Sequence, residues 1–117
     1  LARRYRDIAL AQLETATDAD KPRLQLIADT LAQVPARGAR NLYEAMQSYM
    51  LLWQVMCIEQ APNPFAFSVG NADRIFEPYR NGLDRDTVAG LFKHFLVFFD
   101  ENQKITPPKN SKNARSI

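Results

Sequence analysis

The sequence has little cysteine, histidine and glycine, and these shortages exclude several classes of protein. One cysteine, Cys57, in 117 residues excludes an internal disulfide framework and a cysteine-rich metal site, so we expect a reducing, cytoplasmic location. The one histidine, His94, is far from Cys57 in the sequence, which does not favour a nucleophile–base pair. The four glycines do not form a phosphate-binding loop, because none is followed by Lys-Ser or Lys-Thr or paired with a second glycine.

Charge of one sign and long apolar runs are also missing. Fifteen Lys and Arg against thirteen Asp and Glu give a net charge of +2, which predicts no nucleic-acid partner and no membrane partner. No apolar run approaches the roughly 18 residues that a membrane-spanning helix needs. We expect residues 1–103 to form a helical segment, and residues 104–117, which are polar and basic, to form a flexible tail.

The first 34 residues have the pattern of two amphipathic helices. In residues 2–16 the apolar positions recur at helical spacing. A second apolar stripe follows Asp20-Lys21-Pro22, where Asp20 suits an N-cap and Pro22 suits the first helical turn. The connector is short, so we expect an antiparallel helical hairpin.

A third helix is predicted from residue 42 to about residue 59. Asn41 and Glu44 have the spacing of a capping box, with Asn41 capping and Glu44 reaching back. Apolar residues cover most of the circumference of this helix, which predicts burial on several sides. Such a helix suits one layer of a larger protein better than a free-standing domain of this size.

Prolines end that helix, and a strand-to-helix corner is expected after them. Residues 65–69 are a short strand candidate, Gly70 supplies the turn, and Asp73 is expected to cap a short helix that breaks at Pro78. Asn81-Gly82 predicts a turn, and Asp84 or Asp86 is expected to cap a last helix that ends near residue 100. The predicted fold of this chain is therefore mainly α, with a helical hairpin, two longer helices and one short strand or corner.

No side chain in this sequence is proposed as catalytic, and no metal site is predicted. The most tempting triplet is Cys57-Ile58-Glu59, which places a carboxylate two residues after the thiol. Its neighbours Trp53, Val55 and Met56 are apolar and helical, so we expect Cys57 to be a buried structural thiol.

Four segments stand in a distinctive order along the chain. They are Val34-Pro35-Ala36 with Ala39-Arg40, Tyr43 to Ser48, Phe67 to Arg74, and Pro78-Tyr79. Together they resemble, in order and spacing, a stretch of the pyruvate formate-lyase-type glycyl radical enzymes, which carry Val-Pro-x-x-Pro-Ala-Arg, Phe-x-Glu-Ala-Leu-Gln-Ser, and Ser-x-Gly-Arg-x-Asp-Gln followed by Pro-x-Tyr. The resemblance spans about residues 1–103.

This resemblance implies that the chain is a fragment of a radical C–C lyase or dehydratase and is inactive alone. The parent fold would be a ten-stranded α/β barrel wrapped by helices. An activating enzyme of the radical-SAM class would install a radical on a C-terminal glycine in an Arg-Val-x-Gly motif, which generates a thiyl radical on a barrel cysteine. Neither element matches this sequence, so no cofactor is expected in this chain. Its implied partners are a small-molecule substrate of the parent, the rest of the barrel and the activating enzyme.

The resemblance also nominates residues near the substrate. Phe65 and Ala66 stand where polyol dehydratases often carry polar groups, which argues against a glycerol-type substrate. With Ser68 they are the substrate-pocket candidates, while Gly70, Asn71 and Asp73 form the structural motif. The sequence departs from the family pattern at three positions, which are Gly38 for Pro, Asn71 for Arg and Arg74 for Gln.

Two other interpretations are open. A self-contained helical module that binds a partner protein through residues 42–58 would have no catalytic activity. A degenerate relative of the family would keep the scaffold and lack the radical machinery.

Overall fold

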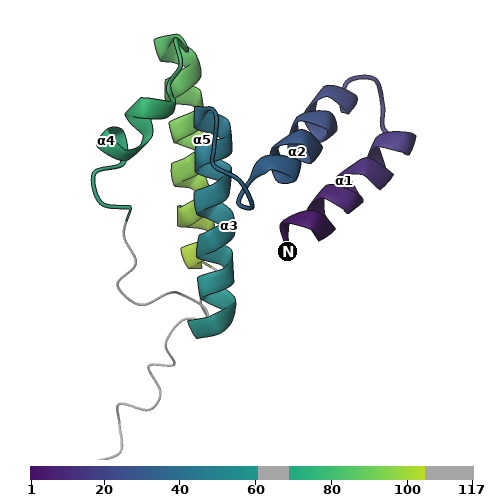
Figure 1. Ribbon diagram of the computed structural model, residues 1–117, viewed down its shortest axis with the longest axis horizontal. Coiled ribbons are helices and arrows are strands. Elements are labelled where there is room, and N and C mark those ends of the chain that lie inside the picture. The colour runs from purple at the N-terminus through teal and green to yellow at the C-terminus, as the bar shows by residue number, and fades with distance from the viewer. Residues whose placement is uncertain (61–68, 105–117) are drawn as a thin grey trace, which may run out of the picture.

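The computed structural model describes residues 1–60 and 69–104, and every element in this part of the chain is helical (Figure 1). The mainly α prediction is thereby confirmed. Of the predicted strand over residues 65–69, only Val69 lies within the described residues, and it is not in a strand. The elements are α1 (Ala2–Thr15), α2 (Lys21–Gln33), α3 (Leu42–Gln60), α4 (Ala72–Phe76), the 3-10 helix η1 (Glu77–Tyr79) and α5 (Arg85–Lys104).

Helices α1 and α2 form the predicted hairpin (Figure 1). Ala9 of α1 and Leu24 and Ala28 of α2 are buried there. Asp20 occupies the N-cap position of α2 as expected, but its side chain does not cap the helix. Its carboxylate instead accepts a hydrogen bond from the Thr17 hydroxyl at 2.8 Å, which holds the connector together.

Helices α3 and α5 lie side by side and run in the same direction (Figure 1). Aromatic rings join them, with centroids 5.6 Å apart for Tyr49 and Phe95 and 5.1 Å apart for Trp53 and Phe99. Short helix α4 inserts Phe76 into the same cluster, 5.4 Å from Phe95. The core therefore lies where α3, α4 and α5 meet. Its buried members are Leu42, Ala45, Met46, Phe76 and Phe95.

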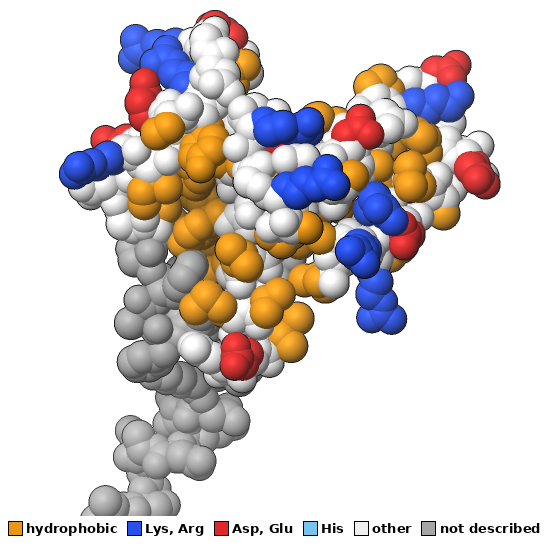
Figure 2. All heavy atoms as spheres, in the orientation of Figure 1, with side chains coloured by type: hydrophobic (Ala, Val, Ile, Leu, Met, Phe, Trp, Pro, Cys, Tyr) orange, Lys and Arg blue, Asp and Glu red, His pale blue; other side chains and the backbone are white. Residues whose placement is uncertain are grey.

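The prediction that α3 is buried on several sides is not met by the described residues. Leu52, Val55 and Ile58 expose 52%, 45% and 77% of their surface, because no other described element covers that face. Leu96 and Val97 of α5 are exposed as well. Figure 2 shows apolar side chains gathered over much of the visible face.

The turn before α5 has the predicted chemistry. Asn81 and Gly82 both have positive φ, 47° and 76°. Asp84 is the cap, since its carboxylate accepts hydrogen bonds from the backbone N–H of Asp86 at 3.1 Å and of Thr87 at 3.2 Å. Helix α5 continues to Lys104, four residues past its predicted end, because no Pro or Gly interrupts the chain before that point.

Candidate functional site

The approach to α4 contains the residues that the sequence nominates for function. Phe65, Ala66 and Ser68 lie outside the described residues, so their place beside a substrate stays a prediction. Gly70, Asn71 and Asp73 are described, and they form the corner through which the chain enters α4.

Gly70 has a positive φ of 69°, which confirms the conformation expected for it. Among the described residues, a Cβ added there would meet only Ile75 Cδ1, at 4.0 Å, which is an ordinary van der Waals contact. The backbone conformation, and not crowding, therefore makes glycine the favoured residue at this corner.

The cap of α4 is one residue after Gly70, and the prediction of Asp73 as the cap was wrong. Asn71 occupies the N-cap position without a side-chain cap, and its carbonyl accepts the Ile75 N–H at 3.0 Å. The chain thus enters the helix two residues earlier than expected, which puts Asp73 in the first turn. The side chains of Asn71, Asp73 and Arg74 are exposed, and none has a hydrogen-bond partner within the described residues. The corner therefore presents an amide, a carboxylate and a guanidinium to its surroundings.

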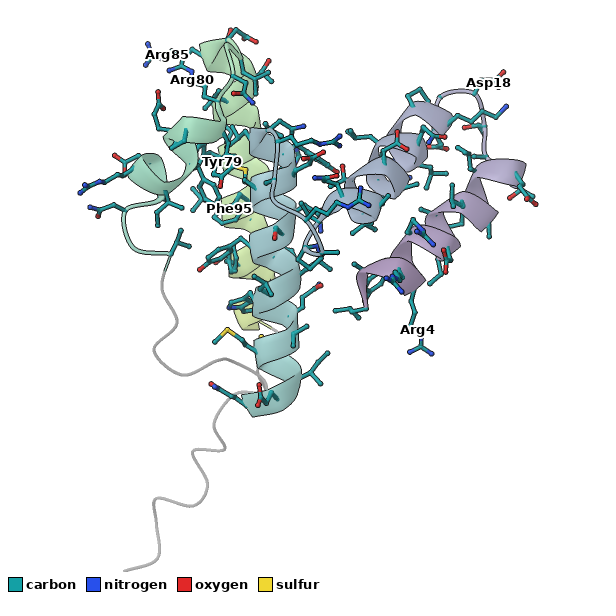
Figure 3. All side chains as sticks on the ribbon, viewed as in Figure 1. Arg4, Asp18, Tyr79, Arg80, Arg85 and Phe95 are labelled. Atoms are coloured by element: carbon teal, nitrogen blue, oxygen red, sulfur yellow. The ribbon has the colours of Figure 1, made fainter. Side chains whose placement is uncertain are left out.

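A hollow of about 430 Å³ lies beside this corner, between residues 35–39, α3 and α4. Its walls are mostly apolar, and its polar side chains are Arg37, Ser48, Tyr49 and Tyr79. Figure 3 shows Tyr79 on the side of the bundle where α4 and η1 meet α3. No carboxylate, imidazole or thiol lines the hollow, so it can enclose an apolar group but holds no pair for proton transfer.

A polar anchor fixes the start of α3. The Asn41 side chain caps the Glu44 N–H at 2.9 Å, as predicted. Glu44, whose side chain is 4% exposed, reaches back one residue further than a capping box requires. Its carboxylate accepts from the Arg40 N–H at 2.7 Å and from the Arg40 guanidinium at 2.6 Å. The Asn81 amide donates to the Arg40 carbonyl at 2.6 Å and so ties this anchor to the turn before α5.

The pKa shifts of Arg40 and Glu44 are those of an ion pair with a structural role. Hydrogen bonding from Arg40 holds the pKa of Glu44 below its usual value, even though burial opposes this shift. The same pair raises the pKa of Arg40. Glu44 is therefore a buried, ionised carboxylate whose hydrogen bonds are used within the chain, and it is not available as a general base.

The structure does not bring Cys57 and His94 together. Cys57 is half-buried on α3, and desolvation raises the pKa of its thiol, which disfavours the reactive thiolate. His94 is exposed on α5 beside Met50. Cys57 stands about two helical turns beyond Met50 along α3. Cys57 was expected to be buried, and it is only half-buried, while its structural role stays a prediction.

Arg23, Tyr43 and Gln47 lie together between α2 and α3, a grouping that the sequence did not predict. Arg23, Tyr43 and Gln47 each line two further hollows. Tyr43 and Gln47 belong to the segment from Tyr43 to Ser48, but nothing in the sequence links them to Arg23, which lies one helix earlier. Their spacing on α3, four residues apart, places Tyr43 and Gln47 on one face, which is the only local signal for this cluster.

Residues 1–60 and 69–104 contain no group of three or more His, Cys, Asp or Glu side chains able to hold a metal ion. Among the described helices, none combines the length and the apolar character needed to cross a membrane.

Comparison with known proteins identifies the family of this chain. A family model described as "Pyruvate formate lyase-like" matches residues 1–117. No curated protein and no solved structure matches the chain.

Proposed function

This chain belongs to the pyruvate formate lyase-like family, and we propose that it forms a non-catalytic part of a glycyl radical enzyme. In this proposal its helices lie on the outside of a ten-stranded α/β barrel, and the corner at residues 68–73 borders the substrate cavity. The observation that carries the proposal is the match of the family model to the whole of residues 1–117.

The residues of this chain do not fit the radical groups of such an enzyme. None of its four glycines stands in an Arg-Val-x-Gly motif. Gly90 comes nearest, since Val88 precedes it by two, but Thr87 replaces the arginine and the segment lies within α5. Cys57 is a helical thiol whose pKa is raised. We therefore assign no radical step to this chain, and the activating enzyme of the parent would act elsewhere.

The exposed apolar faces of α3 and α5 support a place inside a larger protein. Ile58 leaves 77% of its surface uncovered and Leu96 leaves 64%. Large apolar side chains left open in this way are typical of a surface that another part of a protein covers. In the proposal the remainder of the parent barrel covers it.

The reaction we propose for the parent is radical C–C bond cleavage or dehydration of a small molecule. The residues of this chain nearest the substrate would be Phe65, Ala66 and Ser68. Two of these are apolar and cannot bind hydroxyl groups, so a substrate with a hydroxyl at this point is disfavoured. The apolar hollow beside Ile75 and Phe76 agrees with an apolar border at this corner.

The natural reading frame beyond Ile117 tests this proposal. A glycyl radical enzyme requires a cysteine motif and then a C-terminal Arg-Val-x-Gly motif downstream, and the residues after the cysteine separate lyase from dehydratase. If the frame encodes neither motif, the enzymatic proposal is overturned. The helical interaction module or the degenerate relative then becomes the better account.

A further inference from the structure

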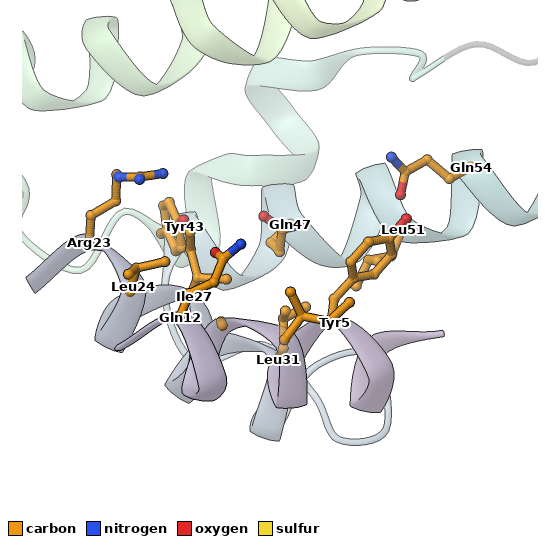
Figure 4. A pocket seen from close by; sticks show the side chains of 12 residues that line it. Tyr5, Gln12, Arg23, Leu24, Ile27, Leu31, Tyr43, Gln47, Leu51 and Gln54 are labelled. Atoms are coloured by element: carbon orange, nitrogen blue, oxygen red, sulfur yellow. The ribbon is translucent and has the colours of Figure 1, made fainter. Parts of the chain in front are cut away.

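Two hollows meet at the side chains of Arg23, Tyr43 and Gln47. The first, of about 370 Å³, lies between the α1–α2 hairpin and α3, and Figure 4 shows these three side chains together on one side of it. The second, of about 380 Å³, lies between α3 and α5 and adds His94 to the same three. Both volumes are in the range of small-molecule sites in proteins.

The polar groups of the second hollow are all able to donate hydrogen bonds, and no carboxylate lines it. The only ion-pair partner of Arg23 within the described residues is Asp20, at 3.7 Å, and both side chains are well exposed. The Tyr43 hydroxyl and the Gln47 amide have no hydrogen-bond partner in the described part of the chain. Burial raises the pKa of Tyr43, so its hydroxyl keeps its proton and can donate. The hollow therefore offers several donors together with the positive charge of Arg23, and no carboxylate in its lining neutralises that charge.

The floor of the hollow is apolar. Met46 and Phe95 are buried at 4% and 2% exposure, and half-buried Met50 and Leu91 stand beside them. Figure 3 shows Phe95 between α5 and the neighbouring helices. A ligand that fits has an acceptor at one end and an apolar body at the other.

We propose that the hollow between α3 and α5 binds an amphipathic monocarboxylate, with its carboxylate on Arg23 and Tyr43 and its chain on Met46, Met50 and Leu91. An arginine binds a carboxylate through two parallel hydrogen bonds, and the neutral Tyr43 hydroxyl supplies a third donor. This site is separate from the corner at Gly70 and does not depend on the proposed function.

Calorimetry with the protein at its natural length tests the chemistry of the site. Octanoate is the probe, and octan-1-ol is its uncharged match. We expect octanoate to bind, and Arg23→Gln to weaken its binding about tenfold or more while leaving octan-1-ol unchanged. Arg85→Gln, at an exposed arginine outside both hollows, is the matched control and should leave octanoate binding unchanged.

NMR of the protein with labelled methionine methyl groups shows where the ligand binds. This chain has three methionines, and Met46 and Met50 line the hollow whereas Met56 does not. Octanoate should shift the NMR signals of the first two and leave that of Met56 in place. The proposal is overturned by any of three results. The first is that octanoate does not bind at millimolar concentration. The second is that Arg85→Gln weakens octanoate binding as much as Arg23→Gln does. The third is that octanoate binds but leaves the NMR signals of Met46 and Met50 unshifted.

Discussion

At the scale of single residues, Gly70 is the position where the backbone constrains the sequence most directly. Its φ of 69° lies in the left-handed region, which costs a residue with a Cβ about 1 kcal/mol. We expect Gly70→Ala to lower the free energy of unfolding by about that amount, as measured by urea denaturation. Within the part of the chain that the structure describes, the one atom near the added methyl group is Ile75 Cδ1, and its distance of 4.0 Å leaves room for that group.

The control for this prediction is Gly38→Ala. Gly38 has no positive φ, and a Cβ there meets nothing within 4 Å, so this change should be neutral or slightly stabilising. Equal effects of the two substitutions would show that the corner does not hold Gly70 in its left-handed conformation.

Glu44 gives a prediction about pH. Its folded pKa lies below the usual 4.5, chiefly because of the hydrogen bond from Arg40. A carboxylate with a lowered pKa contributes stability in full above its unfolded pKa and loses it as the pH falls through the folded pKa. The wild-type chain should therefore lose stability below about pH 4.5, and Glu44→Gln should flatten this dependence and cost about 1–3 kcal/mol at pH 7.

Urea denaturation between pH 3 and pH 7 measures this difference. Asp84, whose pKa is also lowered, mainly by its bond from Thr87, is present in both proteins and cancels. Glu59→Gln, at an exposed position near the end of α3, removes one carboxylate without touching the anchor. A pH profile of Glu44→Gln parallel to that of wild type would show that the ion pair does not form.

Residue-level chemistry was predictable where one local rule decides it. The cap at Asn41 follows from its spacing to Glu44, and the turn at Gly70 follows from the absence of a Cβ. The partner of Glu44 was not predictable, because Arg40 lies outside the capping box and its backbone is held by Asn81, forty-one residues away in the sequence. Asp73 was misassigned as a cap because Asn71, two residues earlier, occupies that position without any side-chain hydrogen bond to signal it.

At the scale of elements, aromatic packing joins α3, α4 and α5. Phe95 is 2% exposed and contacts Tyr49, Phe76 and Phe99 with centroids 5.6, 5.4 and 4.9 Å away. Phe95→Ala should lower the free energy of unfolding by about 3–5 kcal/mol, because it leaves a cavity at the meeting point of three helices. Thermal unfolding followed by circular dichroism measures this loss.

Leu96→Ala is the neighbouring control. Leu96 is 64% exposed, so its truncation should change stability by about 0.5 kcal/mol or less. A comparable loss at both positions would mean that α5 packs in another rotation against α3.

Helices were the most predictable feature, since periodicity and caps located all the longer ones within a few residues. Their mutual arrangement was not predictable from the pattern. The apolar residues of α3 fit several neighbours equally well, and the sequence does not say which face meets α5 and which stays open. The cluster of Arg23 with Tyr43 and Gln47 was missed for the same reason, since it depends on how α2 approaches α3.

At the scale of the whole molecule, the open apolar faces imply association. Produced as residues 1–117, the chain should self-associate with increasing concentration, because Leu52, Val55 and Ile58 present contiguous apolar surface. Sedimentation velocity measures this. Val55→Lys with Ile58→Lys should reduce it without loss of helix content, since both side chains are exposed. A wild-type chain that remains monomeric would favour the self-contained module.

The central claim is that this chain is a non-catalytic part of a glycyl radical enzyme. The most direct test is electron paramagnetic resonance of the protein at its natural length, treated anaerobically with a radical-SAM activating enzyme. We predict a glycyl radical signal of equal intensity in wild type and in Cys57→Ala, because Cys57 has no part in the radical chemistry. The absence of a radical in wild type, or its dependence on Cys57, would contradict this account.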